Sequence, residues 1–302
     1  MTGDAPEPDA RQNRRELWAA ALQERSRSLT ARAEQERRRH ASVDAAFEMA
    51  DRDAEVGGGI IAGALAYRLF IWLLPFALVL VAGLGFAADA ADRSAERTAD
   101  ELGLGELVSD SIEGAAQSPN RWYALLIGVP ILLWVTRSLL RVLISCHRLI
   151  WGEVRAAAPK ATPVATLRLF AVILGFLAAT VFASWVRARS EGFGVLSTLL
   201  TTLPYAGLWV LVSLRLPHRD APLSALLPGA AVFALGVELL HVAAAYLLEP
   251  YVLSKQGTYG ALGVAAALLF GLFLFSRLIV AAAVVDATLW ERRTRTAPEI
   301  RK

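Results

Sequence analysis

Arginines inside long apolar stretches are the residues of this sequence best suited to chemistry. Arg68, Arg137 and Arg277 each interrupt an apolar stretch, and Arg141 follows Arg137 by one helical turn. A charge placed in such a stretch is costly in a bilayer and usually faces a bundle interior or a water-filled cavity. The planar guanidinium binds phosphate or carboxylate through two parallel hydrogen bonds. We therefore predict an anion-binding site formed by these four arginines.

A second polar group lies in another apolar stretch. Glu238 and His241 are three residues apart, so a helix brings them to one face. They can form a proton relay or a satisfied polar pair between helices, and we favour the polar pair. The four histidines of the chain are dispersed, and no HxHxDH-like or GxSxG string occurs. We therefore predict no metal site, no cofactor and no enzymatic activity.

The apolar stretches that carry these residues are long enough to cross a membrane. The mean hydropathy of the 302-residue chain is +0.44, and 55% of its residues are hydrophobic. At about 1.5 Å per residue, a helix of about 20 residues crosses a hydrocarbon core of roughly 30 Å. The candidate spans are Ile60–Phe86, Trp122–Leu143, Thr166–Val186, Val195–Leu216, Leu223–Leu247 and Tyr259–Val285. We predict an all-α polytopic membrane protein, a six-transmembrane-helix bundle.

The charges between the spans predict that both termini lie in the cytoplasm, because Lys and Arg concentrate in cytoplasmic connections. The basic positions are Arg148, Arg155, Lys160, Arg168, Arg215, Arg219, Arg292, Arg293, Arg295, Arg301 and Lys302. The predicted parts are a cytoplasmic N-terminal region (1–56), a transmembrane domain (57–290) with an acidic extracytoplasmic loop (87–121), and a basic cytoplasmic tail (291–302). Within the loop, apolar residues at helical spacing between 104 and 112 predict a short amphipathic helix.

The N-terminal region divides into two parts. Residues 1–10 are rich in Pro, Asp and Glu and are predicted to be disordered. Residues 11–40 are rich in Arg, and an apolar stripe that includes Leu17 and Trp18 predicts an amphipathic helix. This helix can lie on the anionic inner leaflet, although a solvated helix is favoured. No stacking surface or nucleic-acid module accompanies the arginines, so we expect no nucleic-acid partner.

Small residues and prolines predict how the helices pack. Gly59 and Gly63 form a GxxxG pair, which lets helix backbones approach closely. Gly175, Ala179 and Ala183 repeat small residues at the same spacing. Four prolines within or at the start of spans can kink them, and these are Pro75, Pro130, Pro204 and Pro228.

Parts of the sequence resemble a known family. The string GALAYRLFIWLLPFALVL begins at Gly63, PGA occupies 228–230, and TYGALGVAAALLFGLFLFSRLIVAAAVVDATL begins at Thr258. The motif positions are Ala64, Leu65, Ala66, Tyr67, Pro75, Thr258, Tyr259, Gly260, Leu262 and Gly263. Through these motifs the chain resembles the YihY/BrkB family of bacterial inner-membrane proteins, with features of an actinobacterial-type branch.

The resemblance implies six spans with both ends inside and a multi-pass protein of the bacterial cytoplasmic (inner) membrane. Family members have been labelled ribonuclease BN, virulence or serum-resistance factor, and possible envelope-lipid transporter. The chain departs from the family near the end of the last span, where many members place a Gly-Ala-Glu-Leu-Asn-like sequence. Val284 replaces the Glu, and Asp286 replaces the Asn. Any role of that Glu therefore does not carry over.

The predicted depths place the arginines in one layer. The helical rise puts Arg68 and Arg277 roughly 12 Å, and Arg137 roughly 9 Å, from the predicted cytoplasmic boundary. Asp286 is the only obvious acid on the spans in that half, so we expect these arginines to lack partners and to receive an anion. The alternative is that the arginines snorkel to the interface, which we favour for Arg141.

The combined features predict a transporter or flippase for an anionic envelope lipid or metabolite, with an arginine-lined cavity on the cytoplasmic side. The expected partners are anionic membrane lipids and an anionic small molecule, and a homo-oligomer is compatible with the sequence. The alternative is a non-catalytic envelope scaffold or a virulence or serum-resistance type of factor. A ribonuclease is the least favoured, because the residues for metal-dependent hydrolysis are not clustered.

Overall fold

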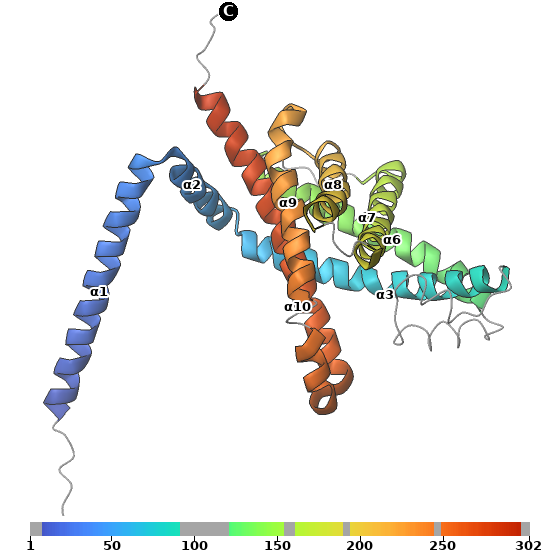
Figure 1. The fold of residues 1–302 in the computed structure, drawn as a ribbon, viewed down its shortest axis with the longest axis horizontal. Coiled ribbons are helices and arrows are strands. Elements are labelled where there is room, and N and C mark those ends of the chain that lie inside the picture. The colour runs from blue at the N-terminus through green and yellow to red at the C-terminus, as the bar shows by residue number, and fades with distance from the viewer. Residues whose placement is uncertain (1–7, 91–120, 154–160, 190–193, 245–248, 297–302) are drawn as a thin grey trace, which may run out of the picture. The chain divides into compact units, whose positions relative to one another are not determined.

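Helices form all the regular elements in the described part of the chain (Figure 1). The computed structural model describes residues 8–90, 121–153, 161–189, 194–244 and 249–296. Its elements are α1 (Pro8–Arg39), α2 (Ala41–Glu55), α3 (Gly58–Ala90), α6 (Arg121–Ile150), α7 (Pro163–Arg189), α8 (Gly194–Ser213), α9 (Leu223–Ala243) and α10 (Glu249–Thr296). The predicted all-α fold is confirmed.

Five of the described helices are long and apolar enough to cross a membrane. Their candidate spans are Gly58–Gly83, Trp122–Ile150, Pro163–Ala183, Leu223–Ala243 and Ala265–Arg295. The chain is therefore a multi-pass membrane protein, as predicted. Helix α8, with 20 residues, takes the place of the fourth predicted span. Its membrane crossing stays a prediction, because the side chains of residues 194–200 lie outside the description.

The helices from α3 to α10 pack as a closed ring. Each of them contacts the next one along the chain, and α10 returns to pack against α3. Figure 1 shows α3 lying beside α6. This arrangement encloses an apolar core in which Leu65, Leu132 and Leu139 are almost completely buried. Burial of such side chains is worth about 1.5–3 kcal/mol each in a soluble protein, but in lipid the contribution comes from close packing.

A buried hydrogen-bond chain fastens α3 to α6. The indole Nε1 of Trp72 donates to Oγ1 of Thr136 at 2.8 Å, and that hydroxyl donates to the carbonyl oxygen of Leu132 at 2.7 Å. Both polar side chains are thereby satisfied away from water, which is the condition for burying them. The Leu-Ala-Tyr motif lies one to two turns earlier on α3, where Leu65 faces the core and Tyr67 is exposed.

Helices α9 and α10 meet at the Pro-Gly-Ala motif. All four predicted prolines lie inside helices, and Pro228 removes one backbone donor from α9. The next residue, Gly229, donates its backbone N–H to Oδ1 of Asp286 at 2.6 Å. A Cβ on Gly229 would overlap the Asp286 carboxylate and the carbonyl oxygen of Ala282. Glycine is therefore required here by a close approach of two helices.

The predicted GxxxG contact is wrong for the described part of the chain. A Cβ added to Gly59 or Gly63 would meet no atom within 4 Å, so neither glycine faces another described helix. Close approaches occur at other glycines. A Cβ on Gly175 would lie 3.2 Å from the side chain of Leu208, where α7 packs on α8. The small-residue repeat of the third span therefore does pack against a neighbouring helix.

Two compact units divide the chain, with the boundary between Asp51 and Arg52. The first unit contains α1, which is helical as predicted for residues 11–40. Its apolar residues do not gather on one face, so the expected amphipathic character is wrong. Leu17 and Trp18 are both exposed within this unit.

The bounds of three other elements differ from expectation. Helix α1 already begins at Pro8, inside the segment predicted to be disordered. Helix α10 begins at Glu249, so the motif from Thr258 to Gly263 lies inside this helix and not at its entry. Helix α3 continues to Ala90, beyond the end of the first predicted span. Most of the acidic loop, with its predicted amphipathic helix, lies outside the described residues.

Candidate functional site

Arg277 is paired, contrary to expectation. Its guanidinium donates to both carboxylate oxygens of Asp53, with an Nη1–Oδ1 distance of 2.9 Å and an Nη2–Oδ2 distance of 3.1 Å. Asp53 lies in the last turn of α2, ahead of the first span, so it is not among the acids of the spans from which the sequence predicts unpartnered arginines. Gly58 permits the contact, because a Cβ there would overlap the Asp53 carboxylate. Arg277 is therefore held in an ion pair that joins α2 to α10.

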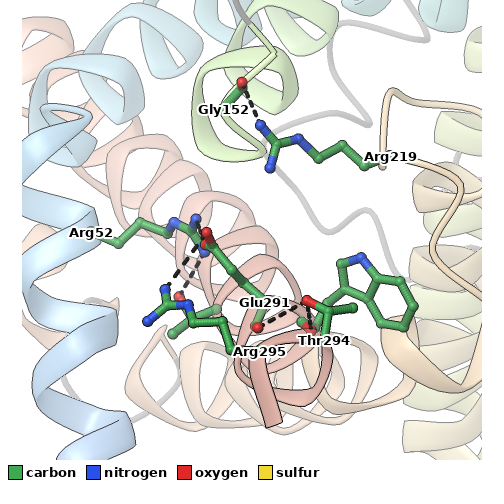
Figure 2. Close-up of polar contacts among 8 residues, drawn as sticks. Arg52, Gly152, Arg219, Glu291, Thr294 and Arg295 are labelled. Atoms are coloured by element: carbon green, nitrogen blue, oxygen red, sulfur yellow. Dashed lines mark hydrogen bonds and ion pairs between the residues drawn. The ribbon is translucent and has the colours of Figure 1, made fainter. Parts of the chain in front are cut away.

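Arg52 adds a second link between the end of α2 and α10. It donates to the carboxylate of Glu291 and, at 3.3 Å, to Oγ1 of Thr288. Arg295 also pairs with Glu291, at 3.6 Å, and Figure 2 shows both arginines reaching this carboxylate. Two neighbouring residues of α2, one basic and one acidic, thus bind residues of opposite charge on α10. The arrangement anchors the start of the helix ring and is not an open anion site.

A turn at the end of α6 is joined to the connection between α8 and α9. Gly152 has φ +64°, and the N–H of Glu153 donates to the carbonyl oxygen of Arg148 at 2.8 Å, which closes the helix in a Schellman arrangement. Arg219 donates from Nη2 to the carbonyl oxygen of Gly152 at 2.7 Å, as Figure 2 shows. Arg219 is therefore a structural link at this end of the ring.

The remaining predicted arginines are not brought into one site by a described cavity. Arg68 on α3 is half-buried, whereas Arg137 and Arg141 on α6 are exposed. Arg137 donates from Nε to the carbonyl oxygen of Ala161 at 3.1 Å. None of the four predicted arginines lines any of the three cavities that lie between the described helices. Their role in binding an anion stays a prediction, with Arg277 already occupied by its carboxylate.

A central cavity of about 120 Å³ lies inside the ring. All six helices of the ring contribute to its lining, and most of the lining residues are aliphatic or aromatic. His147 of α6 also lines it, with its ring edge-on to Trp209 of α8 at a centroid separation of 6.2 Å. His147 is 3% exposed. The cavity is therefore apolar, and neither ring nitrogen of His147 is accessible from it.

A groove between α6, α7 and α8 adjoins the central cavity. Its volume is about 370 Å³, and its apolar lining is interrupted by Arg168 and Arg215. Arg168 lies in the second turn of α7, and Arg215 lies two residues beyond the end of α8. Both side chains are exposed, and neither is ion-paired or hydrogen-bonded to another described residue. Among the described residues no acid lines the groove, and the sequence of the linker 154–160 contains none. The groove thus combines apolar walls with two uncompensated cations.

A third cavity, of about 400 Å³, lies on the other side of an aromatic layer. Phe176 and Phe275 line both this cavity and the central one, and their ring centroids are 5.3 Å apart. Phe233 packs against both rings, at 6.3 and 5.9 Å. His241, one of the two predicted polar residues, lines the third cavity, whereas Glu238 is half-buried on the same helix. A proton relay between these two residues stays a prediction.

The sequence contained Arg168 and Arg215 but gave no reason to select them. The sequence indicates only that both are basic residues that set the orientation, since each lies close to the end of a predicted span. A groove between three helices is formed by residues far apart in the chain, and hydropathy does not reveal it. In the family motif, Leu262 is exposed and Gly263 is half-buried, while the side chains of Thr258, Tyr259 and Gly260 lie outside the description.

The closed ring of apolar helices, with charged links at one end, defines a multi-pass α-helical membrane protein. The family model described as virulence factor BrkB matches residues 54–302, and the chain belongs to this family. The match begins close to the boundary between the two compact units. No curated protein matches the chain, and no solved structure matches it.

Proposed function

We propose that this protein binds an anionic membrane lipid and moves it across the bilayer through the helix ring. The groove with Arg168 and Arg215 is the observation that carries the proposal. Apolar walls suit an acyl chain, and guanidinium groups bind phosphate through charge-assisted hydrogen bonds. The groove volume of about 370 Å³ falls within the range of about 300–1,000 Å³ typical of small-molecule sites.

The predicted orientation supports uptake from the inner leaflet. Arg168 and Arg215 are among the basic positions from which the sequence predicts that this end of the ring faces the cytoplasm. The inner leaflet carries the anionic lipids, which attract basic residues by about 1 kcal/mol per charge near the surface. Because no described acid neutralises the two arginines, their attraction remains available to a phosphate. We therefore propose that the anion binds at Arg168 and Arg215, and not at the arginine layer that the sequence predicts.

The three cavities supply a route beyond the groove. Six residues line both the groove and the central cavity, so only a layer of side chains separates the two. Phe176 and Phe275 then separate the central cavity from the third one. Side chains can rotate without breaking the backbone of the ring, so these layers can open in turn. Moving a lipid in this way needs no covalent step, and we propose no catalytic residue.

Lipid binding to the purified protein tests the proposal. Native mass spectrometry compares adducts of phosphatidylglycerol, which is anionic, with those of zwitterionic phosphatidylcholine. The wild type is expected to retain phosphatidylglycerol preferentially, and the double variant R168Q/R215Q is expected to lose at least tenfold in affinity, since about 1.4 kcal/mol corresponds to tenfold.

The double variant R137Q/R141Q is the matched control, because it removes the same charge from the exposed face of α6. It is expected to bind as the wild type does. If R137Q/R141Q loses the lipid while R168Q/R215Q keeps it, the anion site is at the sequence-predicted arginines and the groove is wrong. Equal binding of both lipids by the wild type contradicts the proposal altogether.

A further inference from the structure

The groove between α6, α7 and α8 carries two positive charges that come from different helices. Arg168 belongs to α7 and Arg215 follows α8, and these two helices pack against each other. Both side chains are exposed, so a headgroup at the groove can reach them. Among the described residues no acid lines the groove. A ligand that compensates both arginines therefore carries more than one negative charge.

We propose that the groove selects a lipid phosphomonoester, whose phosphate is terminal, over a phosphodiester lipid. This inference rests on the proposed function, since it names the class of anionic lipid that the same site binds. A phosphomonoester carries a charge of about −1.5 to −2 at pH 7 and three strong acceptor oxygens. A phosphodiester carries a single negative charge on two free oxygens. The monoester therefore matches the charge of the arginine pair, whereas the diester compensates only one guanidinium.

The rest of the lining gives a second reason for a bare phosphate. Apart from the two arginines, every described residue that lines the groove is aliphatic. A headgroup alcohol or amine beyond the phosphate would find no side chain there with which to form a hydrogen bond. A guanidinium commonly donates two parallel hydrogen bonds to a pair of oxygens. Three terminal oxygens allow both arginines to bind in this way while sharing one oxygen.

The positions of the apolar lining residues favour a lipid over a soluble phosphate. Val172 lies one turn after Arg168 on α7, and Leu211 lies four residues before Arg215 on α8. Both apolar side chains are therefore nearer the middle of their helices than the arginine beside them. A phosphate bound by the arginines places an attached hydrocarbon chain along these residues, which a soluble phosphate leaves uncovered.

Two lipids that differ by one methyl group test this selectivity. Phosphatidic acid is a phosphomonoester, and phosphatidylmethanol with the same acyl chains is the smallest phosphodiester derived from it. Each lipid is titrated separately onto the purified full-length protein and followed by native mass spectrometry, with phosphatidylcholine as the zwitterionic reference. The wild type is expected to bind phosphatidic acid at least tenfold more tightly than phosphatidylmethanol, which corresponds to about 1.4 kcal/mol.

Single substitutions show whether both arginines produce the preference. In R168Q and in R215Q one guanidinium remains, which pairs equally well with either lipid, so the preference for phosphatidic acid is expected to be lost. R137Q/R141Q is the matched control and is expected to keep it. Because the two lipids are compared on the same variant, a loss of folded protein does not imitate this result. A preference that persists in both single variants refutes the joint contact of the arginines with one phosphate.

The remaining outcomes separate this inference from the proposed function. If the wild type binds both anionic lipids equally and more tightly than phosphatidylcholine, the selectivity is refuted while the proposed function stands. If neither anionic lipid binds more tightly than phosphatidylcholine, both have failed. Glycerol 3-phosphate is a phosphomonoester without acyl chains, and in excess it is expected to leave bound phosphatidic acid in place. Displacement by glycerol 3-phosphate would overturn the assignment to a lipid, because the ligand would then be a soluble phosphate.

Discussion

Replacing Gly229 with alanine tests the packing that joins α9 to α10. A Cβ at this position would lie 2.5 Å from Cγ of Asp286 and closer still to its Oδ2 and to the carbonyl oxygen of Ala282, whereas real Cβ contacts essentially never fall below 3.0 Å. A carbonyl oxygen in a packed helix has little freedom to move aside, so the two helices must separate. Separation also stretches the 2.6 Å hydrogen bond from the Gly229 N–H to Asp286.

The expected loss of stability follows from these contacts. Overpacking in a core costs about 1–3 kcal/mol, and leaving a buried hydrogen-bonding group unsatisfied costs about 1–3 kcal/mol. Alanine has a higher helix propensity than glycine, which offsets about 1 kcal/mol of this loss of stability. The free energy of unfolding of G229A should therefore fall by about 3 kcal/mol.

Unfolding of the purified protein in mixed detergent micelles, followed by tryptophan fluorescence, measures this change. Gly207→Ala on α8 is the matched control, because a Cβ there would meet no atom within 4 Å. G207A should be as stable as the wild type or gain up to about 1 kcal/mol. Equal stability of G229A and G207A would refute the close approach of α9 and α10.

Four further substitutions test other parts of the ring in the same unfolding assay. Trp72→Phe removes the 2.8 Å bond to Thr136 and should lower the free energy of unfolding by about 1–2 kcal/mol; no change means that the bond does not form. Arg277→Ala and Asp53→Ala should each lower the free energy of unfolding by about 1 kcal/mol, because the ion pair is partly exposed. Their double variant should lose less than the sum of the two single losses, and strict additivity of the losses would contradict the ion pair. Gly152→Ala should cost about 1 kcal/mol, because φ is +64° there, and a stabilised variant would contradict that turn.

The all-helical fold could be predicted because apolar length is a local property of the sequence. Most of the spans are helices at the expected places, and the prolines do not end them. Packing was harder to predict. A GxxxG pattern shows that two backbones can approach, but Gly59 and Gly63 have no described neighbour. The close approach at Gly229 depends instead on Asp286, which is 57 residues away in the chain.

The candidate site was predictable only in its chemistry. The sequence indicates an anion site formed by arginines, because a charged side chain within an apolar stretch is costly in a bilayer and usually has a function. It did not show that Asp53, outside the spans, folds back onto Arg277. Nor did it distinguish Arg168 and Arg215 from other basic residues that set the orientation, because the groove that contains them is formed by three helices. In the sequence His147 is one of four dispersed histidines, and its burial without a hydrogen-bond partner among the described residues is a property of the folded ring.

Lipid translocation tests the central claim most directly. Vesicles that contain the wild type and a trace of fluorescent phosphatidylglycerol are treated with an impermeant quencher, which reports how fast the lipid changes leaflet. We predict that phosphatidylglycerol changes leaflet faster in vesicles with the wild type than in protein-free vesicles, and that the wild type moves it faster than it moves fluorescent phosphatidylcholine. The rate with R137Q/R141Q is expected to equal the wild-type rate, whereas the rate with R168Q/R215Q is expected to be at least tenfold lower. A wild-type rate equal to that of protein-free vesicles, or an R168Q/R215Q rate equal to that of the wild type, would contradict the account.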